Sequence, residues 1–404
     1  MLVLVLNCAS STRARFAVVD VASGLERFSA LAQNLGSAKG SLEWKAGGAA
    51  HLASLAGATL GGAVRRVASL LGEAGLWDGL AGIAHRVVHG GARFSDSIRL
   101  TEEVVARIRE CIPLGPLHNP SNLVGIEVAQ ELLPGLPHVA VFDTAFHQTM
   151  PPQAYLYAVP YEWFEKHEVR RYGFHGASHR YVSQAAVRRL GLDPADHAIV
   201  TAHLGYGCSL SAVRNGRSTD TTMGLTPVDG VVMGTRSGSI DPSIITHMRK
   251  ALGKDVHEVM DILNRESGLL GISGLSDDMQ VLQTAAERGH HRASLAIEKF
   301  CHSVAKMAAG MVVSLGRCDV LVFTGGIGEK NARVRGKIVE LLGFLGLRLD
   351  GEANALHGKP PDGRVTSSLR PQAIVIPTNE ELVIALDAAR VIGASASPGE
   401  NSPA

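Results

Sequence analysis

The sequence predicts an α/β fold built from two related domains. The chain has 404 residues, more than one ordinary hydrophobic core supports, so two domains are expected. Short apolar runs typical of buried strands alternate along the chain with segments of helical periodicity. Residues 2–20 and 198–216 share one plan: an apolar strand, a turn rich in small residues, and a second apolar strand. This repeat predicts two related domains that face each other.

The predicted elements follow from hydrophobic periodicity in chain order. Apolar runs predict strands at residues 2–6, 15–19, 81–89, 138–142, 197–204, 319–325 and 373–376. Apolar residues three or four apart predict helices at 101–111, 180–191, 239–263, 292–315, 332–342 and 379–392. We expect an N-terminal domain of residues 1–143 plus 381–394, a C-terminal domain of 144–380, and a disordered tail at 395–404, which lacks apolar residues.

Composition excludes several classes of protein. Charged residues make up 19% and the net charge is +1, which argues against a nucleic-acid partner. No apolar run approaches the ~20 residues of a membrane span, and the start lacks the basic segment of a signal peptide, so we expect a cytoplasmic protein without a membrane partner. The five cysteines include no CxxC pair, which argues against a disulfide framework or zinc site and favours buried, reduced thiols.

The stretch DVLVFTGGIGEKNARVRG predicts an anion-binding turn. A buried strand ends at Thr324, the glycines after it allow a tight turn, and a helix follows. Free amide groups and the helix dipole would then point at a phosphate or nucleotide. The stretch is not GxGxxG, because Asn331 occupies the third glycine position, and the chain has no Walker loop. The alternative is an ordinary packing turn.

Two arginines lie in glycine-rich loops that follow apolar strands. Arg86 precedes a glycine pair in AHRVVHGGARF, and Arg236 lies in GVVMGTRSGSIDP before a predicted helix. An arginine among glycines at a strand end suits bidentate recognition of phosphate or carboxylate. For either residue alone, the alternative is a solvated surface arginine.

Histidines occur in two tight turns. His118 is bounded by prolines in PLHNP, and His175 and His179 occur in YGFHGASH. Most single histidines are structural or solvated, and the chain has 17. His175 is the stronger candidate because Gly173 and Gly176 flank it and permit close approach of a ligand.

Two acidic residues follow buried strands. HVAVFDTAFHQTMP places Asp143 where α/β sites carry metal ligands or catalytic carboxylates, with a helix N-cap as the alternative. In IPTNEELVIA, Thr378 and Glu381 have the spacing of a capping box. Glu380 is not needed for that box and is available for Mg²⁺, with a solvated first-turn glutamate as the alternative. Arginines, histidines and carboxylates at strand ends together predict phosphoryl transfer, which depends on positioning and charge neutralisation.

In combination, these motifs resemble those of the acetate kinase family. The matching stretches are LVLNCASS, HRVVHGG, PLHNP, VFDTAFHQTMP, YGFHGASH, GLTPVDGVVMGTRSG, TGGIGE and IPTNEELVIA, in family order from Leu4 to Ala385. The resemblance implies two duplicated domains of the actin, hexokinase and Hsp70 type, which is ribonuclease H-like, with the active site in the cleft between them. It also implies a homodimer that uses Mg²⁺ or Mn²⁺ and catalyses acetate + ATP ⇌ acetyl phosphate + ADP by direct in-line transfer.

The resemblance further implies roles for individual residues. The catalytic set would be Arg86, His118, Asp143, His175 and Arg236, of which the arginines brace the phosphoryl group and the acetate carboxylate. The metal would be held by Asn7 and Glu380, and the acetate methyl would lie among Val88, Leu117, Phe174 and Pro227. Nucleotide or phosphate contacts would come from Ser10, Thr12, Arg15, His203, Gly205, Gly207, Asp278, Gly325, Gly326 and Gly328.

Departures from the family pattern concentrate on the nucleotide side. Tyr206, Gln280 and Lys330 replace the usual residues in HLGYG, SDDMQ and GGIGEK, and Ser239 replaces an aspartate in TRSGS. The replacements at Tyr206, Gln280 and Lys330 predict altered recognition of the phosphoryl donor: weaker ATP affinity, another purine nucleotide, or pyrophosphate. The motifs are also compatible with a propionate or butyrate kinase, since one methylene in an apolar pocket contributes only about 1–3 kcal/mol. A non-catalytic nucleotide-binding module of the same fold is a third possibility.

The first hairpin also departs from the family pattern. It holds one extra residue between Asn7 and Phe16, and the family lysine is replaced by Arg13 or Arg15. An insertion of one residue would move the following side chains to the opposite face unless the turn absorbed it. We therefore expect a β-bulge here.

Overall fold

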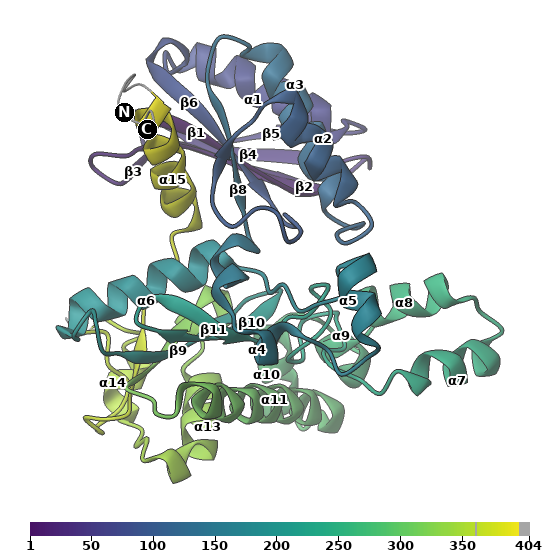
Figure 1. The fold of residues 1–404 in the computed structure, drawn as a ribbon, viewed down its shortest axis with the longest axis vertical. Coiled ribbons are helices and arrows are strands. Elements are labelled where there is room, and N and C mark those ends of the chain that lie inside the picture. Colours follow the sequence, from purple (N-terminus) through teal and green to yellow (C-terminus); the bar gives the residue numbers. More distant parts are fainter. Residues whose placement is uncertain (360–361, 396–404) are drawn as a thin grey trace, which may run out of the picture. The chain divides into compact units, whose positions relative to one another are not determined.

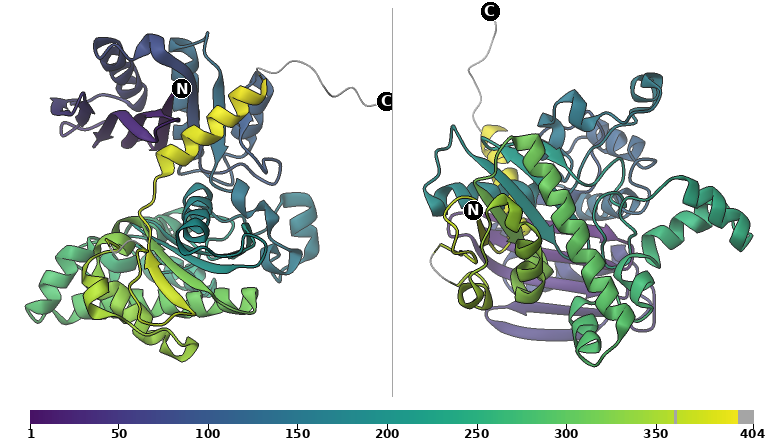
Figure 2. Two further views of the ribbon diagram at one scale, coloured as in Figure 1. Left: turned by 90° about the vertical axis from the view of Figure 1, so that its left-hand side faces the viewer. Right: turned by 90° about the horizontal axis from the view of Figure 1, so that it is seen from below.

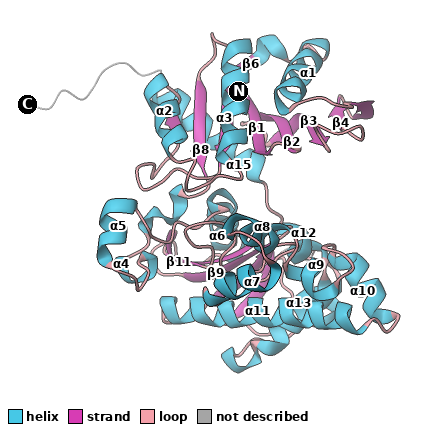
Figure 3. Cartoon of the chain, turned by 90° about the vertical axis from the view of Figure 1, so that its right-hand side faces the viewer, coloured by secondary structure: helices cyan, strands magenta, loops and turns pink. Residues whose placement is uncertain are grey.

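The computed structural model describes residues 1–359 and 362–395, which form two compact units. Unit 1 comprises residues 1–146 and the chain from Asn379, and unit 2 comprises residues 147–378. Each unit contains one sheet with helices packed on it (Figures 1 and 3). The predicted α/β class is therefore confirmed. The tail expected at 395–404 lies outside the described residues except for Ser395, which ends a helix.

Unit 1 is built on an eight-stranded sheet. The strands are β1 (Leu2–Ser10), β2 (Arg13–Asp20), β3 (Leu25–Gln33), β4 (Ser41–Ala46), β5 (Ala49–Ser54), β6 (Leu80–Val87), β7 (Ile98–Arg99) and β8 (His138–Phe142). Their order is β5-β4-β3-β2-β1-β6-β8-β7. Strands β1 to β5 form an antiparallel meander, whereas β1, β6 and β8 are parallel. The carboxyl ends of β1, β6 and β8 therefore share one edge.

Side-chain alternation along β1 and β2 divides the core of unit 1 into two layers. Leu4, Leu6 and Phe16 belong to a layer that includes residues of the helices on one face. Val3 and Val5 belong to the opposite layer with residues of the last helix. The helices of unit 1 are α1 (Leu60–Glu73), α2 (Glu102–Glu110), α3 (Asn119–Leu132) and α15 (Glu380–Ser395), with a 3₁₀ turn η1 (Trp77–Gly79). A further 3₁₀ turn, η2 (Ala145–Thr149), spans the boundary between the units.

Unit 2 repeats the strand order of unit 1. Its strands are β9 (Ala198–Leu204), β10 (Cys208–Arg214), β11 (Arg217–Thr221), β12 (Val320–Thr324) and β13 (Gln372–Val375), in the order β11-β10-β9-β12-β13. Strands β11, β10 and β9 are antiparallel neighbours, and β12 and β13 run parallel to β9. The order β3-β2-β1-β6-β8 of unit 1 has the same strand directions. The two sequence repeats are hairpins β1–β2 and β9–β10 at equivalent positions. The predicted duplication is therefore confirmed by topology.

Helices cover both faces of the second sheet. Helix α6 (Gly176–Leu190) packs on one face and the long helix α11 (His291–Leu315) crosses the other (Figures 1 and 2). The other helices are α4 (Pro152–Tyr155), α5 (Tyr161–His167), α7 (Ser243–Leu252), α8 (Val256–Arg265), α9 (Gly268–Ser273), α10 (Met279–Glu287), α12 (Gly325–Lys330), α13 (Ala332–Leu341) and α14 (Gly351–Ala355), with η3 (Gly343–Leu345).

Two sequence expectations about the fold are corrected. The helix expected at 239–263 is two helices, because Gly253 adopts a left-handed conformation after α7 and Asp255 starts α8 with a capping box. Not all cysteines are buried: Cys111 and Cys318 are partly exposed, whereas the other three are buried. None of the five forms a disulfide. Within the described residues, no helix is long and apolar enough to cross a membrane.

A buried histidine pair in unit 1 predicts acid lability. His85 Nε2 lies 2.9 Å from His138 Nδ1, and His138 Nε2 lies 3.1 Å from the Leu133 carbonyl oxygen. Burial lowers the pKa of both rings below the usual value, with repulsion from His138 adding to the effect on His85. Below about pH 6.5 the unfolded chain therefore binds more protons than the folded chain. As the pH decreases through this range, the free energy of unfolding decreases by up to about 1.4 kcal/mol per pH unit for each such histidine. Above pH 6.5 this contribution is fully present.

The substitution His85→Gln keeps a donor for His138 but removes one titrating ring. We expect the free energy of unfolding of this variant to fall less steeply between pH 6.5 and 5 than that of the wild type, as measured by urea titration at each pH. His302, which is exposed on α11, provides the control, and His302→Gln should keep the wild-type slope. Equal slopes for His85→Gln and the wild type would contradict the assignment of acid lability to this pair.

Candidate active site

One polar cluster lies at the carboxyl edge of the parallel strands of unit 1. Arg86 donates from Nε to Asp143 Oδ1 at 2.8 Å and from Nη2 to Asp143 Oδ2 at 2.6 Å, a bidentate pair. Its Nη1 lies 3.3 Å from Asn7 Oδ1 and 4.0 Å from Glu380 Oε2. Asn7, Arg86 and Asp143 each lie two residues beyond a member of the core layer that packs on α15. The structure thus brings together four predicted residues, and Asp143 pairs with Arg86 rather than capping a helix.

The charges in this cluster are tightly coupled. Burial would lower the pKa of Arg86, but attraction to Asp143 and Glu380 outweighs it and the pKa rises. Burial also raises the pKa of Glu380, and the negative charge of Asp143 adds to this rise against the opposing effect of Arg86. Two carboxylates thus share one guanidinium at close range. The surplus negative charge suits a bound cation.

The bulge expected in the first hairpin is present. The β1–β2 pairing shifts by one residue between Asn7 and Ser10, so the strand after the turn keeps its face. Asn7 pairs with Arg15 across the strands, which places both on the α15 face. Arg15 is held by Glu381 at 2.6 Å and Glu26 at 3.1 Å. Arg15 is therefore committed to carboxylates of unit 1.

Polar side chains also occupy the tip of this hairpin and the start of α15. Ser10 and Thr12 are on the tip, where their hydroxyl oxygens are 3.5 Å apart. The predicted capping box of Thr378 and Glu381 is absent, because Asn379 accepts from Leu382 N–H at 3.1 Å and caps α15 instead. Glu381 is drawn to Arg15, and the Thr378 amide donates to Glu329 Oε1 at 3.0 Å.

Two buried amides that sequence reasoning missed hold the loop after β6. Asn122 accepts from Val88 N–H at 3.0 Å and donates to the Cys8 carbonyl at 2.8 Å. Asn119 accepts from His89 N–H at 3.1 Å and donates to the His89 carbonyl at 2.9 Å. Both asparagines are on α3, which begins directly after His118. Helix α3 therefore positions the loop that carries Val88.

The apolar residues proposed for the methyl pocket are placed individually within the two units. In unit 1, Val88 is buried and Leu117 is exposed. In unit 2, Phe174 is buried and its carbonyl oxygen lies 3.0 Å from His147 Nε2. Pro227 is partly exposed, and its carbonyl oxygen accepts from Arg236 Nη1 at 3.5 Å.

In unit 2, Arg236 is a partly buried cation that pairs with no carboxylate among the described residues. Its Nη1 contacts the Pro227 carbonyl and the Met233 sulfur, at 3.8 Å, and Arg236 forms no ion pair in the described part of the chain. Desolvation lowers its pKa. A Cβ atom placed on Gly207 would lie 3.3 Å from Arg236 Nη1 and 3.5 Å from His175 Nε2. The side chains of Arg236 and His175 therefore both lie beside Gly207 in unit 2. A desolvated guanidinium that forms no ion pair in the described residues favours binding of an anion.

His175 has a backbone conformation that costs energy. It precedes α6 with φ of 57°, in the left-handed region. Gly173, with φ of 74°, packs so closely on Thr221 and His147 that a Cβ would lie 2.4 Å from Thr221 Cγ2. The His175 and His203 rings stack at 4.3 Å. The strained turn thus presents His175 beside His203, both of which the sequence predicted as site residues.

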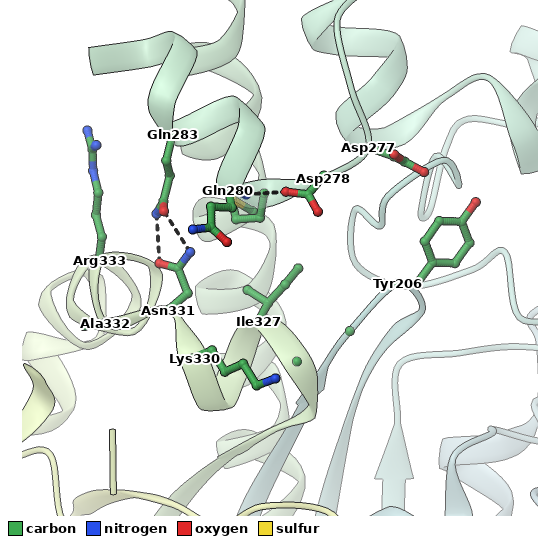
Figure 4. Close-up of a pocket in the computed structure, with 13 residues that line it drawn as sticks. Tyr206, Asp277, Asp278, Gln280, Gln283, Ile327, Lys330, Asn331, Ala332 and Arg333 are labelled. Atoms are coloured by element: carbon green, nitrogen blue, oxygen red, sulfur yellow. Dashed lines mark hydrogen bonds between the residues drawn. The ribbon is translucent and has the colours of Figure 1, made fainter. Parts of the chain in front are cut away.

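A cavity of about 550 Å³ lies within unit 2 (Figure 4). This volume is in the range of sites for ligands of nucleotide size. Tyr206, Gln280 and Lys330, three of the departures from the family pattern, all line it. Its other lining residues are Gly205, Asp277, Asp278, Met279, Gln283, Gly326, Ile327, Asn331, Ala332 and Arg333. Gln283 and Asn331 exchange two hydrogen bonds, at 2.8 and 3.0 Å, on one wall (Figure 4).

The residues of unit 2 that were predicted to bind phosphate lie partly in the wall of the cavity and partly in the turn that begins α12. Asp278 lines the cavity and also caps α10, accepting from Gln280 N–H at 2.7 Å. Gly325 begins α12 directly, and a Cβ there would lie 2.8 Å from the Leu204 carbonyl oxygen, so only glycine fits. The Gly328 carbonyl accepts from Arg335 Nη1 at 2.9 Å. Arg335 is fully buried, was missed by sequence reasoning, and fixes the turn behind the cavity.

The residues around Arg86 fit a divalent cation of the Mg²⁺ type. In residues 1–359 and 362–395, no group of three or more His, Cys, Asp or Glu side chains could hold a metal by itself. Mg²⁺ is usually bound by one or two carboxylates together with water and substrate phosphates. Glu380, Asp143 and the amide oxygen of Asn7 supply oxygen ligands of this kind, and all three contact or lie beside Arg86.

Comparisons with known proteins agree with this description. The family model described as the Acetokinase family matches residues 2–386. A relative named acetate kinase from Deinococcus radiodurans is 48% identical, over 97% of this chain and 98% of the relative. The crystal structure of a propionate kinase from Francisella tularensis has the same fold, with a TM-score of 0.91 and 42% identity over 96% of this chain and 98% of that chain. The crystal structure of an acetate kinase from Porphyromonas gingivalis also has this fold, with a TM-score of 0.89 and 39% identity over 97% of this chain and 99% of that chain. The chain is therefore a kinase of the acetokinase family.

Proposed function

We propose that the protein transfers a phosphoryl group reversibly from ATP to acetate, giving acetyl phosphate and ADP. The observation that carries this proposal is Arg236, a partly buried guanidinium that contacts a carbonyl and a thioether but no carboxylate among the described residues. Such a cation is stabilised by an anionic ligand, and both substrates are anions. The relatives named acetate kinase support the choice of acceptor.

The reaction needs little covalent chemistry from the protein. Acetate is ionised at neutral pH, so its oxygen attacks the γ-phosphorus without a general base, and the bond from phosphorus to ADP breaks. Arg86 and Arg236 neutralise charge on the phosphoryl group and on the acetate carboxylate, and His175 donates to an equatorial oxygen. Asp143 keeps Arg86 charged and fixes its plane by the bidentate pair. His118 assists near the acceptor.

Mg²⁺, or Mn²⁺, would be held by Asn7 and Glu380. A divalent cation in such a place neutralises phosphate charge during transfer. Glu380 contributes a carboxylate whose charge Arg86 alone does not balance, because Arg86 is shared with Asp143. Asn7 contributes an amide oxygen beside Arg86.

The acceptor pocket would comprise Val88, Leu117, Phe174 and Pro227. Small apolar side chains suit a methyl group, but one more methylene changes the binding free energy by only about 1–3 kcal/mol. The structural relative named propionate kinase gives a specific reason to test the longer acid. Propionate is therefore the second candidate acceptor.

Two further features of the proposal concern the assembly and its location. Helix α7 has no buried residue, and its Ile244 and Leu252 are exposed. Together with α8 it forms a helix pair that extends from the rest of unit 2 (Figure 2). An exposed apolar stripe of this kind supports a homodimer, which light scattering would detect at twice the 42.6 kDa chain mass. The thiols of five cysteines without a disulfide support a cytoplasmic location.

Trapping the product with hydroxylamine tests the function. The purified protein is incubated with Mg²⁺, ATP and either acetate, propionate or butyrate, and acyl hydroxamate is measured. We expect hydroxamate with acetate at the highest kcat/KM. Absence of hydroxamate with every acid, with ATP, GTP and pyrophosphate each tried as donor, would contradict the proposal and favour a nucleotide-binding module without catalysis.

The donor is expected to be a nucleotide that contacts Lys330. An ammonium facing a nucleotide phosphate across an open cavity contributes up to about 1 kcal/mol. We expect Lys330→Ala to raise KM for ATP about fivefold with little change in KM for acetate. Lys337→Ala is the control, because Lys337 pairs with Glu298 and does not line the cavity. An unchanged KM for ATP in Lys330→Ala, or higher activity with pyrophosphate than with ATP, would contradict this assignment.

A further inference from the structure

Behind His175 lies a chain of hydrogen-bonded side chains that the proposed mechanism does not use. His175 Nδ1 lies 2.8 Å from Ser209 Oγ, and the same oxygen lies 2.8 Å from His179 Nε2. His179 Nδ1 lies 2.7 Å from Thr201 Oγ1. Ser209, His179 and Thr201 are all fully buried, between α6 and strands β9 and β10. We call these three side chains the Ser209 relay.

The direction of hydrogen bonding begins at Thr201. Its single hydroxyl proton can point to the Ser211 carbonyl oxygen at 3.3 Å or to His179 Nδ1 at 2.7 Å, and we assign it to the carbonyl, which can only accept. Thr201 Oγ1 must then accept from His179. His179 Nδ1 therefore carries a proton.

The direction continues through His179 to Ser209. Burial, together with the neighbouring His147 and His203, holds the pKa of His179 well below its usual value, so the ring is neutral at physiological pH. A neutral ring protonated at Nδ1 has a lone pair at Nε2. The Ser209 hydroxyl donates its proton to that lone pair. Towards His175, Ser209 Oγ can then only accept.

We propose that the Ser209 relay fixes neutral His175 as the Nδ1–H tautomer, so that its Nε2 can donate to a phosphoryl oxygen only when the ring is protonated. This inference rests on the proposed function, because it concerns the group that contacts the transferred phosphoryl. Ser209, His179 and Thr201 are positioning residues that act through His175. They make turnover depend on imidazolium and weaken binding of the phosphoryl group at alkaline pH.

The groups that face His175 come from several elements. His203 of β9 stacks on it at 4.3 Å, and His179 of α6 lies at 6.4 Å between ring centroids. From the loop before α7, Arg236 reaches the same side of Gly207 as His175 Nε2. A phosphoryl group bound beside Arg236 would bring negative charge to this point and favour the imidazolium form.

The tautomer can be observed without activity. In the full-length protein labelled with ¹⁵N-histidine, two-bond ¹H–¹⁵N correlation spectra distinguish a protonated ring nitrogen from one with a lone pair, and His175→Gln assigns the signals. At alkaline pH we expect wild-type His175 to be protonated at Nδ1. In Ser209→Ala, and in the isosteric Thr201→Val, we expect His175 to shift towards the Nε2–H form.

Ser211→Ala is the matched control. Ser211 lies in the same strand as Ser209 and is equally buried, but its side chain bonds Ser218 and the Asp220 carbonyl, and its own carbonyl remains to accept from Thr201. The control should keep the wild-type spectrum of His175. It also measures the loss of stability that follows from removing any buried hydroxyl of this strand.

The kinetic readout is the alkaline limb of the pH profile of kcat. In the wild type and Ser211→Ala, kcat should fall about tenfold per pH unit once His175 loses its proton. In Ser209→Ala and Thr201→Val, neutral His175 can donate from Nε2, so the fall should be less than about threefold per unit.

Each outcome bears on one of the two claims. A wild-type His175 protonated at Nε2, in an enzyme that forms acetyl phosphate, overturns the relay and leaves the proposed function standing. A wild-type His175 protonated at Nδ1 supports the relay even if His175→Gln remains fully active, in which case the proposed role of His175 fails. Identical pH profiles of all four proteins would overturn the kinetic consequence.

Discussion

Replacing Arg236 by alanine is expected to lower kcat/KM by roughly 10³ to 10⁵, the usual effect of losing an arginine that stabilises a phosphoryl transition state. The physical reason is the position of the guanidinium beside His175 and Gly207, where it has no competing carboxylate within the described residues. The measurement is initial-rate formation of acyl hydroxamate over a range of acetate concentrations. Retention of more than about a tenth of the wild-type rate would contradict the assignment.

The same substitution should leave the fold intact. Because Arg236 is desolvated without a counter-ion, its removal takes away an electrostatic cost together with its packing. We expect the free energy of unfolding of Arg236→Ala to lie within about 1 kcal/mol of the wild type. Arg265→Ala, at an exposed residue of α8, is the control for loss of an arginine elsewhere in unit 2. A loss of several kcal/mol would show that Arg236 is chiefly structural.

Replacing Arg86 by alanine is expected to abolish turnover to a similar extent and, in contrast, to destabilise the protein. Arg86 is paired bidentately with Asp143, and Glu380 lies 4.0 Å from it. Its removal leaves the buried carboxylate of Asp143 without its cation, which typically costs about 3–5 kcal/mol, and takes one positive charge from the partly buried Glu380. Urea unfolding at pH 7 measures this loss, and activity is measured in the hydroxamate assay.

A second substitution separates the two effects. In Arg86→Ala with Asp143→Asn, one of the unpaired charges is removed, so stability should partly recover while activity remains lost. Arg27→Ala provides the control, because Arg27 forms an exposed pair with Asp20 that contributes less than about 1 kcal/mol. If Arg86→Ala were as stable as Arg27→Ala, the pair with Asp143 would not be the structural element described above.

Local patterns along the chain were sufficient to predict the α/β class, the repeated hairpin and candidate residues at the edge of the first sheet. The β1–β2 hairpin and the equivalent β9–β10 hairpin follow from strand alternation, whereas the bulge was predicted from one extra residue relative to the pattern of the resembled family. Asp143 and Arg86 could be predicted as candidate site residues because each occurs where a buried strand ends. Neighbouring parallel strands bring their carboxyl ends to one edge of the sheet, and this brings Arg86 and Asp143 into contact. The alternation of strands and helices along the chain already indicates such a parallel arrangement.

The remaining features depend on contacts between side chains that sequence patterns do not encode. Asn119 and Asn122 bond backbone groups of distant loops, and neither residue differs in spacing from an ordinary helical asparagine. His179 and Thr201 meet only because α6 packs on β9. The predicted capping box failed for a related reason: Glu381 has a stronger partner in Arg15, which is 366 positions away in the chain. Local hydrogen-bonding rules were outweighed by a tertiary ion pair.

The reverse reaction followed by ³¹P NMR tests the central claim most directly. The purified protein is mixed with acetyl phosphate, ADP and Mg²⁺, and the phosphorus signals are recorded over time. Direct transfer predicts that acetyl phosphate disappears as the three signals of ATP appear in equal amount, with Arg236→Ala inactive. Loss of acetyl phosphate to inorganic phosphate with ADP unchanged, or no reaction at all, would contradict the proposal that this chain is an acetate kinase.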